Sequence, residues 1–131
     1  MSDDLADGPL SGRALLIEDN AIVALDTQDM LGAMGFDPID IAASVAEALV
    51  LMQAHSYSAA VVDLVVKDGS SRPAMDQLIK AGVPFVIASG YVNDGTAAPA
   101  LKSAPQITKP YDEALLRAAL VEARRQASRG R

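Results

Sequence analysis

Five polar side chains stand directly after four apolar segments of the chain, and their types suit metal or phosphoryl chemistry. In chain order they are Glu18 and Asp19, Asp63, Ser89, and Lys109. A single acidic residue after an apolar run usually only begins a loop, so none of them is informative alone. If the four segments are parallel strands of one sheet, however, their carboxyl ends meet at one edge, where ligands bind in open α/β proteins.

The three carboxylates of this group predict a cation site. Two carboxylates about 4 Å apart repel each other by roughly 4 kcal/mol at an effective dielectric of about 20, so such a cluster needs a compensating positive charge. Oxygen ligands without histidine or cysteine favour Mg²⁺, which keeps several waters and shares its remaining positions with a phosphate. A serine donor and a lysine charge facing the carboxylates would complete a site for phosphoryl oxygens.

The segments that must position these side chains alternate between strand and helix patterns. The Val-rich run 59–65 has no polar alternation, which predicts a strand buried on both faces. The other predicted strands are 14–17, a segment within 37–43, 83–88 and 106–108. Five strands that alternate with helices imply an α/β fold, with a parallel sheet covered by helices on both faces.

Capping residues and apolar spacing locate the helices between these strands. They are expected from Asn20 to about Met34, from the capping box Ser44–Glu47 to near His55, from 71–73 to Gly82, and from Asp112 to about Gln126. The first is expected to bury Val23, Met30, Leu31 and Met34. A fourth helix within 93–105 can only be short and weakly anchored, because that segment contains two prolines and a glycine.

Composition restricts the classes of protein to which the chain can belong. Its 131 residues, half of them hydrophobic, form one globular domain, and the net charge of −6 argues against nucleic acid as a partner. No apolar run approaches the roughly 18 residues of a membrane span, so a cytoplasmic protein without membrane contacts is expected. We expect a flexible acidic tail at 1–12, a folded domain at 13–126 and a basic tail at 127–131.

With these residues in this order, the chain resembles the receiver domains of two-component response regulators over about residues 13–126. In that family an acidic pair ends the first strand, a phosphoacceptor aspartate the third, a Thr or Ser the fourth, and a Lys-Pro pair the fifth. The matching residues here are Glu18-Asp19, Asp63, Ser89 and Lys109-Pro110. The resemblance implies a doubly wound, flavodoxin-like fold with the strand order 2-1-3-4-5.

The resemblance also implies a function for the acidic residues. Asp63 would be the nucleophile that takes a phosphoryl group from the phosphohistidine of a sensor histidine kinase or a histidine phosphotransferase. Asp19, Asp63 and the backbone carbonyl of Val65 would hold Mg²⁺, with Glu18 acting mainly through bound water. Such a protein catalyses its own phosphotransfer and dephosphorylation but serves mainly in signalling.

The remaining matched residues receive roles in the same way. Ser89 would bond the new phosphoryl group, and Lys109 would pair first with Asp63 and then with its phosphate. The Lys109–Pro110 peptide bond is expected to be cis, as in the family.

The chain departs from the family near its switch region. Residues 85–91 loosely resemble the Phe-Ala-Thr-Gly-x-Tyr type of alphaproteobacterial receivers, with Ser89 in place of the threonine and Tyr91 two residues later. Many receivers carry an aromatic residue two or three positions before the lysine, where this chain has Gln106 and Thr108 instead. Tyr91 and the loop after it are therefore expected to form the switch or, alternatively, a lid over the phosphoryl group.

Three functional classes follow from these observations. Since no output domain follows the last predicted helix, the favoured class is a stand-alone receiver that signals by protein contact or onward phosphotransfer. A haloacid-dehalogenase-like phosphatase also uses a strand-end aspartate, but it needs a second aspartate two residues later, where this chain has Val65. The third class is a pseudo-receiver, a protein-binding module that is not phosphorylated.

Overall fold

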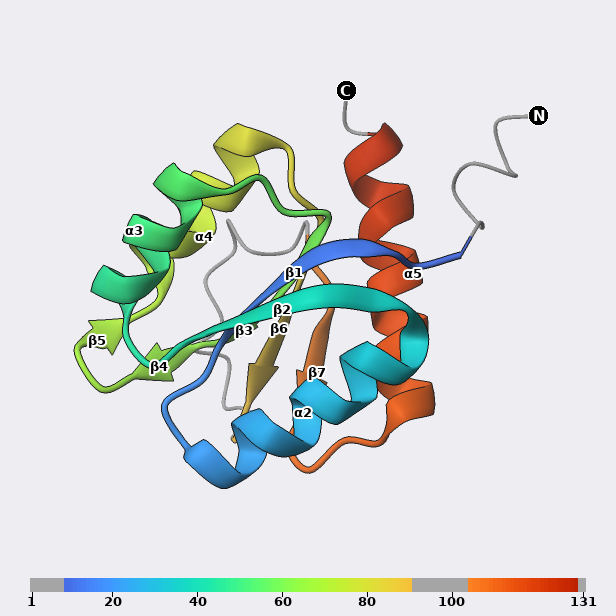
Figure 1. Ribbon diagram of the computed structural model, residues 1–131, viewed down its shortest axis with the longest axis horizontal. Helices are drawn as coiled ribbons and strands as arrows, with labels where there is room; N and C mark the ends of the chain where they lie inside the picture. The colour runs from blue at the N-terminus through green and yellow to red at the C-terminus, as the bar shows by residue number, and fades with distance from the viewer. Residues whose placement is uncertain (1–8, 91–103, 130–131) are drawn as a thin grey trace.

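The computed structural model describes residues 9–90 and 104–129, which form a five-stranded parallel sheet covered by helices on both faces (Figure 1). The strands of this sheet are β1 (Gly12–Ile17), β2 (Phe36–Ala42), β3 (Ala59–Asp63), β6 (Phe85–Ser89) and β7 (Gln106–Thr108). All neighbouring strands run parallel, in the order β2-β1-β3-β6-β7. This order confirms the predicted 2-1-3-4-5 topology.

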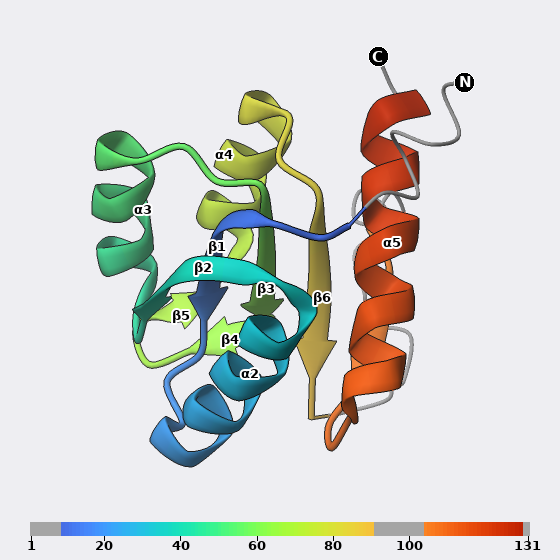
Figure 2. The same ribbon diagram turned by 45° about the vertical axis from the view of Figure 1, so that its right-hand side comes forward.

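Four helices lie within the described residues. They are α2 (Ala21–Met34), α3 (Val45–Ala54), α4 (Arg72–Ala81) and α5 (Glu113–Arg129). Helices α3 and α4 cover one face of the sheet, and α2 and α5 cover the other (Figure 2). None of these four helices is long and apolar enough to cross a membrane. The expected short helix within 93–105 falls mostly on residues outside the described part of the chain.

Helix α2 begins at its predicted cap, directly after the acidic pair. The side-chain oxygen of Asn20 accepts hydrogen bonds of 3.0 Å from the amides of Ile22 and Val23. The helix ends at Gly35, whose φ of 120° is open to glycine but strained for other residues. Because the cap immediately follows β1, the two acids are held at the carboxyl end of that strand.

The buried face of α2 differs from the predicted one. Leu31 and Met34 are buried as expected, Met30 packs partly buried against the same cluster, and Val23 is only partly buried. Ala24 and Thr27 take the fully buried positions in the first half of the helix, while Ile22 is 80% exposed. The apolar residues of α2 itself lie on more than one side of the helix, so their spacing alone did not show which face meets the sheet.

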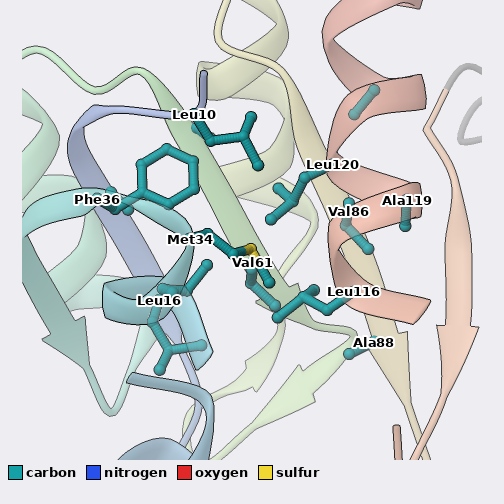
Figure 3. Close-up of a cluster of buried hydrophobic side chains, with 14 of the residues drawn as sticks. Leu10, Leu16, Met34, Phe36, Val61, Val86, Ala88, Leu116, Ala119 and Leu120 are labelled. Atoms are coloured by element: carbon teal, nitrogen blue, oxygen red, sulfur yellow. The ribbon is translucent and has the colours of Figure 1, made fainter. Parts of the chain in front are cut away.

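The central strands bury both of their faces, which explains their continuous apolar sequence. Leu16 and Val61 point toward α2 and α5, where they pack with Leu116 and Leu120 (Figure 3). The residues that alternate with them belong to a second cluster beneath α3 and α4, with Leu15, Ile17, Val62 and Ile87 at its centre. No polar side chain fits inside these strands, and the functional groups are therefore confined to their ends.

The ends of the folded part lie slightly outside the expected boundaries of 13 and 126. Leu10 is buried in the core beside Phe36, and Gly12 already pairs with β2 (Figure 3). The carbonyl of Pro9 accepts a hydrogen bond of 3.3 Å from Arg124. Helix α5 continues beyond Gln126 to Arg129. Most of the expected acidic tail, residues 1–8, lies outside the described residues.

A small hairpin follows β3. Strand β4 (Val65–Val66) pairs antiparallel with β5 (Gly69–Ser70), and residues 67–68 form the connection. Val66 is buried beneath α3 and α4, whereas the Val65 side chain is exposed. The hairpin thus lies immediately after the predicted phosphoacceptor, Asp63.

Candidate functional site

The carboxyl ends of β1, β3, β6 and β7 meet at one edge of the sheet and bring the predicted residues together. Asp63 is the register partner of Ala88, and Ser89, the next residue, pairs with Thr108. The amide of Lys109 donates a hydrogen bond of 2.9 Å to the carbonyl of Ser89. Parallel pairing therefore places Ser89 at the end of β6, the strand next to that of Asp63, and Lys109 just after β7, the strand beyond it.

The three predicted carboxylates form a compact cluster. Glu18 and Asp63 are buried, Asp19 is exposed, and one oxygen from each of the three lies within 4.8 Å of the others. The amide of Asn20 donates a hydrogen bond of 3.0 Å to Glu18, which orients that carboxylate. Oxygen ligands at this spacing, one of them facing solvent, fit a Mg²⁺ ion that keeps part of its water shell.

Lys109 supplies the positive charge that this cluster requires. Its Nζ lies 2.8 Å from Glu18 and 3.0 Å from the Oδ2 atom of Asp63. Burial by itself lowers the pKa of Lys109, but the hydrogen bonds to the two carboxylates outweigh burial and raise it. The lysine is therefore charged at neutral pH. The Lys109–Pro110 peptide bond that follows it is cis, as expected.

The surroundings of Asp63 make its ionised form costly. Burial raises the pKa of its carboxyl group, and the nearby negative charge of Glu18 raises it further. The hydrogen bond from Lys109 acts in the opposite direction but does not cancel these effects. A carboxylate with a raised pKa is a stronger base, and hence a stronger nucleophile, than an exposed aspartate.

This shift predicts that the site reduces the stability of the fold. Because the pKa of Asp63 is higher in the folded protein, ionising it favours the unfolded state, and stability is lost as pH rises through the folded-state pKa. Asp63→Asn should therefore raise the free energy of unfolding at pH 7 by roughly 1 kcal/mol, an ordinary size for a single substitution. Urea unfolding in metal-free buffer measures the difference.

The predicted gain should shrink as pH falls from 7 toward the ordinary aspartate pKa of 3.8, because the raised pKa makes Asp63 of the folded wild type take up its proton first. Asp29→Asn, which removes an exposed carboxylate from α2, is the matched control and should change stability little at any pH. A destabilised Asp63→Asn protein would contradict the raised pKa.

The roles predicted for two residues, Val65 and Tyr91, stay predictions. Val65 begins β4, and its backbone carbonyl remains a predicted metal ligand; its side chain is 61% exposed. Tyr91, the predicted switch or lid, lies outside the described residues. Gln106 and Thr108, which occupy the place of the usual aromatic residue, are exposed.

The sequence analysis missed an aromatic residue close to the site. Tyr111 packs against the α2–α5 core, and its hydroxyl shares a hydrogen bond of 2.7 Å with Thr27 of α2. Burial raises the pKa of Tyr111, and the negative charge of Glu18 adds to this effect. Its position two residues after Lys109 was the available signal. The bond joins the loop that carries Lys109 to the helix that follows the acidic pair.

Comparison with known proteins gives a result for the structure but none for the sequence. No model of a known protein family matches the chain, and a sequence search of curated proteins finds no match. A response regulator receiver domain (CheY-like) from Methylobacillus flagellatus superposes with a TM-score of 0.74 and 28% identity, over 87% of this chain and 99% of that one. The chain has the fold of CheY-like receiver domains.

Two further solved structures share this receiver fold. SdrG from Sphingomonas melonis Fr1 matches with a TM-score of 0.73 and 23% identity, over 88% of this chain and 98% of SdrG. The PhyR stress response regulator matches with a TM-score of 0.74 and 26% identity, over 93% of this chain. That match covers only 48% of PhyR, so the chain corresponds to about half of that protein.

Proposed function

We propose that this protein is a cytoplasmic, single-domain response regulator that accepts a phosphoryl group on Asp63. The donor would be the phosphohistidine of a sensor kinase or of a histidine phosphotransferase. The observation that carries the proposal is the position of Lys109, which contacts both Glu18 and Asp63 at the edge where the carboxylates gather.

In the proposed reaction, an Asp63 carboxylate oxygen attacks the phosphorus atom. The new bond joins that oxygen to phosphorus, while the phosphorus–nitrogen bond breaks and the imidazole of the donor leaves. Lys109 lies 3.0 Å from Asp63 and is placed to neutralise charge on the transferred group. Ser89, at the end of the adjacent strand, would donate its hydroxyl to a phosphoryl oxygen, since hydrogen bonds to charged acceptors are about twice as strong as neutral ones.

Asp19, Asp63 and the backbone carbonyl of Val65 would hold Mg²⁺, with Glu18 acting through bound water. When bound, Mg²⁺ supplies positive charge that neutralises the oxygens of the phosphoryl group. The spacing of the three carboxylates, with Asp19 facing solvent, supports this assignment.

We propose that the phosphorylated protein signals by contact with a protein target or by passing the phosphoryl group onward. The match over 99% of the Methylobacillus flagellatus receiver domain supports the presence of a whole receiver domain in this chain. The loose Phe-Ala-Thr-Gly-x-Tyr pattern at 85–91 supports a switch that uses Tyr91 instead of an aromatic residue on β7. Neither nucleic acid nor membrane is part of the proposal, in keeping with the net charge of −6.

Incubation with acetyl phosphate and Mg²⁺, followed by intact-mass measurement, tests the proposal. We expect the mass to increase by one phosphoryl group and to return slowly to its original value. Continuous release of inorganic phosphate without a stable adduct would instead indicate a phosphatase. If neither the small donor nor a panel of phosphorylated histidine phosphotransferases labels the protein, a pseudo-receiver that binds proteins without phosphorylation replaces this proposal.

A further inference from the structure

Hydrogen bonds fix the backbone immediately after Asp63, at the base of the β4–β5 hairpin. The amide of Leu64 donates to the carbonyl of Ala88 at 3.2 Å, and the amide of Ser71 donates to the carbonyl of Leu64 at 3.0 Å. The buried Ser71 hydroxyl donates to the carbonyl of Asp63 at 2.5 Å. Both ends of the hairpin are thereby tied to the end of β3.

The tip of the hairpin is attached to a different element, the first turn of α3. One carboxylate oxygen of Asp68 accepts a hydrogen bond of 2.9 Å from the amide of Val45, and the other accepts one of 3.2 Å from the amide of Ala46. Figures 1 and 2 both show the hairpin beside the beginning of α3. Asp68 thus joins two segments that are more than twenty residues apart in the sequence.

Helix α3 also has a side-chain cap of its own, which holds its third amide, while Asp68 accepts from the first two. The Ser44 hydroxyl accepts a hydrogen bond of 3.1 Å from the amide of Glu47, and the Glu47 carboxylate accepts one of 2.7 Å from the amide of Ala43. This pair is a variant of the capping box, in which the Glu47 carboxylate accepts from the amide of the residue before the cap instead of from the amide of Ser44. The hairpin depends on this contact as well, because an isolated two-stranded hairpin is marginally stable and needs outside contacts.

We infer that Asp68 is a positioning residue for the phosphorylation site. Its two hydrogen bonds to α3 hold the hairpin, and with it the backbone of Val65, beside Asp63 and the acidic cluster. The hydrogen bonds from Val45 and Ala46 also lower the pKa of Asp68, so the attachment persists into mildly acidic solution. The link from hairpin position to cation binding rests on the proposed function, because it assumes that the Val65 carbonyl is a ligand.

The test measures Mn²⁺ binding to the unphosphorylated protein by paramagnetic broadening of its amide signals, with Mn²⁺ as a probe for the magnesium site. Asp68→Ala should weaken the affinity about 10-fold, the lower end of the range for residues that support a metal ligand. Hydrogen exchange at the amides of Val45 and Ala46 should become faster in the same variant. Asp68→Asn retains one acceptor oxygen and should give an intermediate loss of affinity.

Glu47→Gln is the matched control for charge. It removes one negative charge from the same turn of α3 but keeps an oxygen that can accept the hydrogen bond from Ala43. Its Mn²⁺ affinity should remain close to that of the wild type. An equal loss in Glu47→Gln and Asp68→Ala would assign the effect to charge, and an unchanged affinity in Asp68→Ala would show that the attachment is not needed. Either result overturns the inference.

The inference and the proposed function can fail separately. If Asp68→Ala weakens Mn²⁺ binding as expected but no donor phosphorylates the wild type, the positioning role stands and the proposed function falls. If the wild type is phosphorylated on Asp63 and Asp68→Ala binds Mn²⁺ as tightly as the wild type does, the positioning role falls and the proposed function stands.

Discussion

Replacing Asp63 with asparagine is expected to abolish phosphorylation of the protein by acetyl phosphate and by any cognate phosphohistidine donor. An amide cannot supply the nucleophilic oxygen, and the other carboxylate facing Lys109, Glu18, is buried and already engaged by the amide of Asn20. Intact-mass measurement of wild type and variant under identical conditions gives the result directly.

Asn and Asp have nearly the same shape, so the amide spectrum of Asp63→Asn should remain that of a folded protein. The matched control is Asp29→Asn, a substitution of the same type at an exposed position on α2, which should be phosphorylated like the wild type. Persistent labelling of Asp63→Asn would show that another residue accepts the phosphoryl group.

Replacing Asp19 with alanine is expected to remove both Mg²⁺ binding and phosphorylation. Asp19 is the exposed member of the acidic cluster, and with Asp63 it provides the predicted side-chain ligands. Loss of a residue that only supports a metal ligand already costs about 10- to 100-fold in affinity, so loss of a direct ligand should cost at least as much. A Mg²⁺ titration followed by amide chemical shifts measures the affinity.

Removing Mg²⁺ from the wild type with EDTA should have the same effect on phosphorylation as Asp19→Ala, and added Mg²⁺ should restore labelling in the wild type alone. Asp26→Ala removes an exposed carboxylate farther along α2 and should leave both properties unchanged. Phosphotransfer that proceeds in EDTA would rule out the metal assignment.

Local sequence was sufficient to predict the sheet and the edge at which the polar residues gather. The Val-rich run before Asp63 has no polar alternation because α2 and α5 cover one face of β3 while α3 and α4 cover the other. Asn20 and Gly35 bound α2 through side-chain capping and a positive φ, which are properties of single residues and their neighbours. Such signals act over a few residues and can therefore be read without a structure.

Only the tertiary structure showed which residues at that edge are buried and which of them form ion pairs. Glu18 and Asp19 are adjacent in the sequence, but only Glu18 is buried against Lys109, because its amide still bonds to Ala42 of β2 while Asp19 faces solvent. The attachment of Asp68 to α3 and the bond between Tyr111 and Thr27 were equally invisible in the sequence. These contacts join segments far apart in the chain, and their geometry depends on how helices and strands pack, which no local pattern specifies.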